Sequence, residues 1–121
     1  MSKPAFSVHA FGLYLLILGI VLTIAPNLLL STFGIAETSE VWIRVVGILA
    51  FNIGIYYIYA ARCEAKAFFQ ASVYTRALVL VSFTAFAALG FASPLLILFG
   101  AVDFTGAIWT QLALRAEKAG S

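Results

Sequence analysis

The residue best placed to do chemistry is a single carboxylate, Asp103, inside an apolar run from Pro94 to Leu114. An ionisable group in such a run is costly unless it faces protein or water and meets a partner. Gly100 and Gly106 share the helical face of Asp103, and small residues allow a second helix to approach closely. We therefore expect Asp103 to point into a contact between helices.

Arg44 is the predicted partner of that carboxylate. It lies near the start of another apolar run, and Gly47 and Gly54 lie on its helical face. Because a guanidinium offers forked donors that suit a carboxylate, we expect an ion pair between Arg44 and Asp103. Such a pair either fixes only the register of two helices or lines a small polar pocket. The side chains that could complete this pocket are Asn52, Thr105, Trp109 and Thr110.

Two further ionisable side chains are secondary candidates. Arg76 begins near one end of its apolar run, so we expect it to extend toward the lipid headgroups. The alternative is that Arg76 shares Asp103 with Arg44. His9 lies close to the start of the first apolar run and is expected to be an interfacial histidine, with a proton relay as the alternative.

The sequence contains no recognisable catalytic or metal-binding motif. Cys63 is the single cysteine and His9 the single histidine, so neither a CxxC pair nor a zinc ligand set is available. The net charge of +2 comes with no basic patch, which argues against nucleic acid as a partner. We therefore predict no catalytic residues, no metal and no cofactor, although a lipid or quinone could bind.

Composition indicates the elements that position these residues. The chain is 64% hydrophobic and 10% charged, whereas soluble domains are about 45–50% apolar and about 25% charged. One small core cannot bury that much apolar surface. Since a membrane span needs about 20 apolar residues, we predict an all-α, single-domain integral membrane protein. Its spans are expected at about 6–25, 40–61, 73–92 and 94–114, with an interfacial turn at 27–35.

The first apolar run is longer than the usual core of a signal peptide, about 7–15 residues, so we expect it to be retained as a span. Basic residues predict the orientation, because cytoplasmic loops carry excess Lys and Arg. One side would hold Lys3, Arg62, Lys66, Arg115 and Lys118, and the opposite loops have no basic residue. Both termini should then face the cytoplasm, with the protein in the cell inner (plasma) membrane.

Short connections and glycine spacing predict how the spans pack. The second span should lie antiparallel beside the third, and the third beside the fourth, in an up-down four-helix bundle. Gly12 and Gly19 are seven residues apart, as are Gly47 and Gly54. This spacing keeps small residues on one seam. It favours close packing of the first two spans or, equally, a contact between two copies.

Several segments resemble the DoxX-like family of small four-helix membrane proteins. They are the first span ending in AP, the apolar turn NLLLSTFGI, the opening WIRVVGILAFNIG of the second span, and the Asp in the last span. The resemblance implies a four-helix bundle in a bacterial-type membrane with both ends in the cytoplasm. Some members of that family look like subunits of quinone-linked oxidoreductases, while most have no established activity.

The functional expectation is a small non-catalytic membrane protein that acts as a subunit or as a lipid- or quinone-binding module. Its expected partners are the lipid bilayer and either another membrane protein or a second copy of the chain. The alternative is a small proton-coupled transporter that works as a dimer and uses Asp103. An enzyme is the least supported class, because the sequence offers no nucleophile with a matching base.

Overall fold

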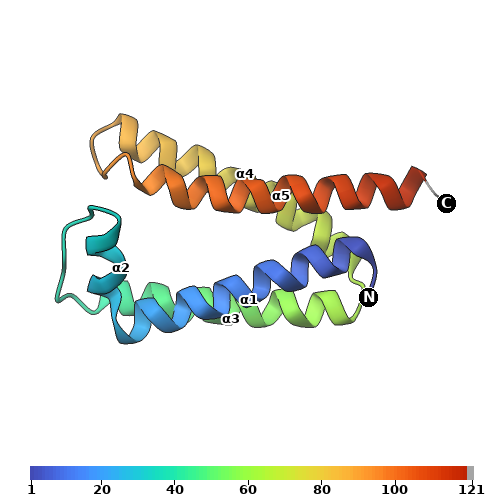
Figure 1. The fold of residues 1–121 in the computed structure, drawn as a ribbon, viewed down its shortest axis with the longest axis horizontal. Coiled ribbons are helices and arrows are strands. Elements are labelled where there is room, and N and C mark those ends of the chain that lie inside the picture. The colour runs from blue at the N-terminus through green and yellow to red at the C-terminus, as the bar shows by residue number, and fades with distance from the viewer. Residues whose placement is uncertain (120–121) are drawn as a thin grey trace.

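The computed structural model describes residues 1–119, and the elements in this part of the chain are all helices. The prediction of an all-α protein is therefore confirmed. Figure 1 shows four long helices and one short helix. They are α1 (Lys3–Ile24), α2 (Pro26–Thr32), α3 (Trp42–Arg62), α4 (Lys66–Ala88) and α5 (Leu96–Ala119).

The four long helices correspond to the four predicted apolar runs, and each is long and apolar enough to cross a membrane. α4 begins at Lys66, earlier than the predicted start at 73, because residues 66–72 continue the helix through a more polar turn. The segment predicted as an interfacial turn contains α2. Pro26 lacks a backbone N–H, which ends α1 and suits the first turn of α2.

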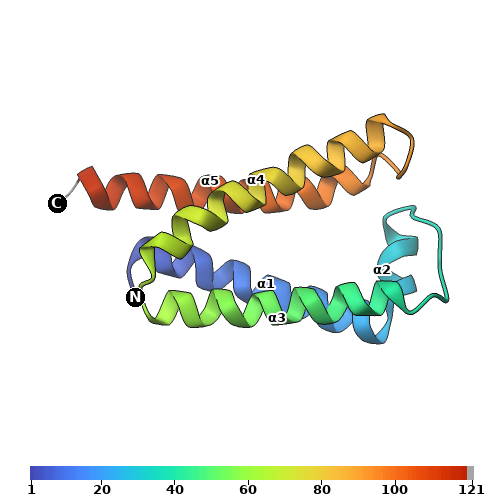
Figure 2. The same cartoon turned by 180° about the vertical axis from the view of Figure 1, so that it is seen from behind.

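The long helices are arranged as two antiparallel pairs. α1 packs along α3, α4 packs along α5, and the pairs meet mainly through α1 and α5. Figures 1 and 2 show that the pairs lie close at the end that holds the N-terminus and separate toward α2. The predicted α4–α5 neighbours are found, but the expected packing of α3 along α4 is wrong, since these helices make only slight contact.

Glycines explain why α3 pairs with α1. A Cβ atom on Gly19 would lie 2.6 Å from the carbonyl oxygen of Gly47, and one on Gly54 would lie 2.9 Å from the carbonyl oxygen of Gly12. Backbones this close leave no room for a side chain. The predicted close packing of the first two spans is confirmed. The glycine seam joins α1 and α3 of the same chain.

The N-terminus is tied to the connection between α3 and α4. The backbone N–H of Ser2 donates to Glu64 Oε2 at 3.0 Å, and the Ser2 hydroxyl accepts from the N–H of Ala5 at 3.2 Å, which caps α1. Glu64 has a left-handed backbone, with φ of 53°. This turn therefore brings the start of α1 against the start of α4.

Acidification should loosen this N-terminal attachment. Hydrogen bonds from the side chain and the backbone of Ser2 hold the pKa of Glu64 below its ordinary value. A lowered pKa means that the ionised carboxylate favours the folded state above the pKa of the unfolded chain, and that this contribution is lost as the pH falls through the lowered value. We expect the amides of Ser2 and Ala5 to lose protection against hydrogen exchange, measured relative to their intrinsic exchange rates at the same pH, as the pH falls.

The matched variants are Glu64→Gln and Glu37→Gln. Glu64→Gln should show the reduced protection already at neutral pH, whereas Glu37 is exposed in the opposite connection and its replacement should change nothing at the N-terminus. Identical acid titrations of exchange in wild type and Glu64→Gln would contradict the assignment.

Candidate functional site

An apolar cavity of about 270 Å³ lies between the two helix pairs. Its walls come from α1, α2, α3, α4 and α5, so it forms where the pairs separate. Side chains that represent the five helices are Leu18, Leu30, Val46, Phe83 and Phe99. A second apolar hollow of about 260 Å³ shares part of this wall and is lined by α1, α2 and α5.

Among the described residues that line this cavity, Asp103 is the only one with a charged side chain. As predicted, its helical face meets other helices: a Cβ on Gly100 would lie 2.9 Å from Leu80 Cα of α4, and one on Gly106 would lie 3.0 Å from a ring carbon of Phe11 of α1. Within residues 1–119 the Asp103 carboxylate makes no hydrogen bond or ion pair. It is thus a half-buried acceptor at the wall of an apolar space.

Arg76 is the most deeply buried charged residue of the site, with only 2% of its surface exposed. Its Nε donates to Ser72 O at 3.1 Å, and its Nη2 donates to Ser72 Oγ and to Thr110 Oγ1, both at 2.9 Å. The guanidinium carbon also lies 4.8 Å from the ring centre of Phe11 and 5.6 Å from that of Tyr57. These contacts fix the guanidinium between α1, α3, α4 and α5.

The prediction that Arg76 extends to the headgroups is therefore wrong. An arginine can fold back along its helix when the preceding turn offers an acceptor, and Ser72, four residues earlier, offers both a hydroxyl and a carbonyl oxygen. Thr110 of α5 adds a third acceptor at the facing position. At the headgroup level, water would have solvated the guanidinium. Here three hydrogen bonds and the faces of two aromatic rings take the place of that water.

Arg76 is also the arginine that interacts electrostatically with Asp103. Its Nη1 atom is buried and has no hydrogen-bond partner among the described residues. A Cβ on Gly106 would lie 3.1 Å from this atom, and Gly106 is one helical turn from Asp103 on the same face. The cation and the carboxylate therefore occupy one seam, too far apart for a direct ion pair.

The predicted ion pair between Arg44 and Asp103 is not formed. Arg44 Nη1 donates instead to the carbonyl oxygens of Thr23 and of Ile24, the latter at 3.3 Å. The last carbonyls of a helix lack partners within it and carry partial negative charge, so a cation there is favourable. Because α3 lies along α1 and not along α5, these carbonyls are the nearer acceptors.

The remaining predicted residues are dispersed around the molecule. Asn52 lies on the exposed face of α3, and the Thr105 hydroxyl bonds to the carbonyl of Ala101 in its own helix. Trp109 is 45% exposed and meets Phe6 edge-on, with ring centres 6.0 Å apart. None of the three lines the cavity that contains Asp103.

His9 and two serines complete the buried polar atoms. His9 Nδ1 is buried without a hydrogen-bond partner in the described part of the chain. Ser7 Oγ lies 2.7 Å from Thr110 Oγ1, so Ser7, Thr110, Arg76 and Ser72 form one hydrogen-bonded group across α1, α4 and α5. Sequence reasoning missed both serines. The available signal was the four-residue spacing of Ser72 and Arg76, which places them on one helical face.

The chemical capability of the site follows from this arrangement. An apolar space can take an apolar molecule, and a carboxylate on its wall can accept a hydrogen bond from a polar head. The buried guanidinium supplies positive charge nearby. No family model, no curated protein and no solved structure matches this chain.

Proposed function

We propose that this chain is a small, non-catalytic integral membrane protein that binds a lipid or a quinone in the cavity between its two helix pairs. Asp103 would be the polar contact of the bound molecule. The observation that carries the proposal is the apolar cavity of about 270 Å³ with one carboxylate in its wall. The resemblance to the DoxX-like family agrees with a four-span protein that serves as a binding module or as a subunit.

Insertion in a membrane is supported by the outward faces of the helices. α1, α3, α4 and α5 have 22, 21, 23 and 24 residues, enough to cross a hydrocarbon core of about 30 Å at about 1.5 Å per residue. Large apolar side chains on all four helices are exposed, for example Ile17, Leu49, Val81 and Leu112. In water these faces would form a very large apolar patch.

The basic residues support an orientation with both termini in the cytoplasm of a cell whose inner (plasma) membrane holds the protein. Lys3, Arg62, Lys66, Arg115 and Lys118 lie toward the ends of the helices that meet near the N-terminus, and the α2 connection carries only acidic charges. Cytoplasmic loops are enriched in Lys and Arg.

A retained-ligand measurement tests the binding function. The protein is purified in mild detergent, and native mass spectrometry quantifies co-purified lipid and quinone. Phe83→Trp enlarges a cavity-lining side chain and should abolish retention, whereas Val81→Trp adds the same ring on the outward face of α4 and should not. Asp103→Asn should reduce retention about tenfold to a hundredfold, because a hydrogen bond to a charged group is worth about 1.5–3 kcal/mol. Equal retention in Phe83→Trp and Val81→Trp would refute binding in this cavity.

A proton-coupled transporter acting as a dimer is the second candidate. It is favoured by one observation, that the Asp103 carboxylate borders the cavity and is not held in an ion pair within residues 1–119. In proteoliposomes such a transporter should lose pH-gradient-driven uptake on Asp103→Asn while still binding its substrate. Uptake that survives this substitution would eliminate it.

A further inference from the structure

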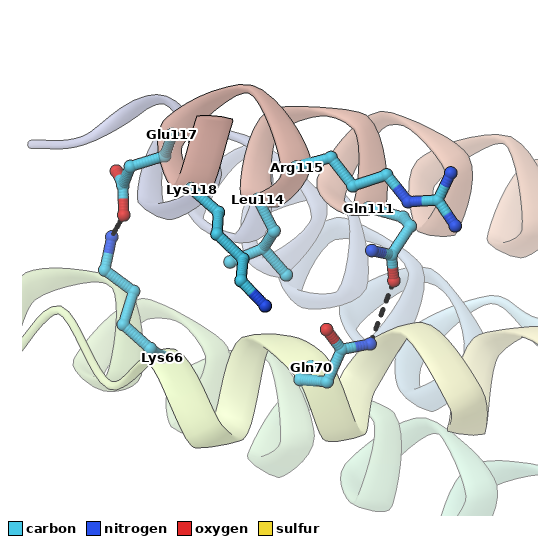
Figure 3. Close-up of a pocket in the computed structure, with 7 residues that line it drawn as sticks. All are labelled: Lys66, Gln70, Gln111, Leu114, Arg115, Glu117 and Lys118. Carbon is cyan, nitrogen blue, oxygen red and sulfur yellow. Dashed lines mark hydrogen bonds and ion pairs between the residues drawn. The ribbon is translucent and has the colours of Figure 1, made fainter. Parts of the chain in front are cut away.

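A separate pocket, lined mainly by charged and amide side chains, lies at the opposite end of the α4–α5 pair from its connecting turn. It has a volume of about 490 Å³ and lies between the first turns of α4 and the last turns of α5. Figure 3 shows the side chains of Lys118 and Leu114 directed from α5 toward α4. The floor is closed by a hydrogen bond of 2.9 Å from Gln70 Nε2 to Gln111 Oε1.

The charges that line this pocket are unequal. Three are cations, Lys66, Arg115 and Lys118, and one is a carboxylate, Glu117, so the net charge is two positive. Lys66 forms ion pairs with Glu117 and with Glu64, the latter at 3.7 Å, so Lys66 is already matched by carboxylates. Arg115 has no hydrogen bond or ion pair to any residue that the structure describes.

The donors of the pocket are those that recognise phosphate. The Arg115 guanidinium presents forked N–H groups that bind phosphate oxygens in pairs. One turn earlier, Gln111 uses its oxygen to accept from Gln70, so its own NH₂ group remains a donor. Arg115 follows Gln111 by one helical turn on α5, and both residues line the pocket, with the Arg115 side chain running along α5 in Figure 3.

We propose that this pocket binds the phosphate of an acidic phospholipid headgroup, with Arg115 as the principal contact. The inference rests on the membrane insertion in the proposed function, because insertion places this end of α4 and α5 at the headgroup level. The apolar side chain of Leu114 in the pocket wall suits the start of the lipid chains. Clusters of basic residues at the cytoplasmic surface attract anionic lipids by about 1 kcal/mol per residue.

The test is lipid selection in vesicles. The protein is reconstituted in phosphatidylcholine with a minor fraction of phosphatidylglycerol, extracted, and analysed by native mass spectrometry for the enrichment of phosphatidylglycerol. Arg115→Gln should lower this enrichment by more than about tenfold, because hydrogen bonds to a charged phosphate are worth about 1.5–3 kcal/mol, and Arg115→Lys should lower it less because charge remains. Arg62→Gln removes an exposed arginine at the end of α3, outside the pocket, and should lower the enrichment by no more than about fivefold, the effect of one surface charge.

Each outcome of this experiment either supports or overturns the proposed phosphate site. Equal losses in Arg115→Gln and Arg62→Gln, or no enrichment in wild type, overturn the pocket and leave only surface charge. Inorganic phosphate that binds as tightly as the lipid, and that depends on Arg115, would assign the pocket to soluble phosphate compounds and overturn the lipid source. Insertion into phosphatidylcholine alone tests the proposed membrane location, so the two proposals can fail separately.

Discussion

Replacing Arg76 with methionine should lower the free energy of unfolding by about 3 kcal/mol, because it removes buried hydrogen bonds to a charged group, each worth about 1.5–3 kcal/mol. The variant leaves Thr110 and Ser72 without the donors that now reach them at 2.9 Å, and Asp103 loses the cation with which it interacts. Unfolding by SDS in mixed micelles, followed by tryptophan fluorescence, measures the loss. Arg76→Lys should recover only part of it, since an ammonium group cannot reproduce the planar fork.

Arg44→Met is the matched control, because it removes an arginine that is exposed and bonds only to carbonyls at the end of α1. Its expected cost is about 1 kcal/mol. Combining Arg76→Met with Asp103→Asn should cost less than the sum of the single changes, as the double variant removes both charges. Additive losses, or equal losses for Arg76→Met and Arg44→Met, would contradict the central role assigned to Arg76.

Gly19→Ala should destabilise the protein by about 2 kcal/mol, within the range for overpacking. On an open helix the same change stabilises by about 1 kcal/mol. Here a Cβ would lie 2.6 Å from Gly47 O and 2.7 Å from Phe51 N. Both are backbone atoms, which can move only if α1 and α3 separate, so the clash outweighs the gain in helix propensity.

Gly19→Leu should be more damaging than Gly19→Ala in the same SDS titration. Ala101→Leu enlarges an exposed residue of α5 and should be nearly neutral. A Gly19→Ala protein that is as stable as wild type would show that the α1–α3 seam is less tight than the structure describes.

The apolar runs predicted the helices, and the repeated glycine spacing predicted the seam between α1 and α3. Helix pairing beyond that seam could not be predicted, since it depends on contacts between residues far apart in the chain. Arg44 illustrates this: its depth in an apolar run suggested Asp103 as the partner, yet the packing of α3 on α1 puts the carbonyls of Thr23 and Ile24 closer.

Arg76 illustrates the opposite case. Its position near the start of an apolar run is typical of an arginine that reaches the headgroups. Three ordinary hydroxyl residues, Ser7, Ser72 and Thr110, become a hydrogen-bonded group only when α1, α4 and α5 are assembled. The cavity beside Asp103 depends on the same assembly, so sequence could place the carboxylate on a helix contact but could not predict the space next to it.

The two-pair arrangement has a consequence for how the chain is made. α1 and α3 pack against each other through the glycine seam, and Arg44 of α3 bonds to the end of α1. The α1–α3 pair can therefore assemble as soon as both helices have left the ribosome. Arg76 emerges on α4, and its bond to Thr110 must await α5, which follows α4 in the chain. During synthesis there is therefore a stage at which α4 carries the charged Arg76 before Thr110 has been made. That stage ends when α5 is complete.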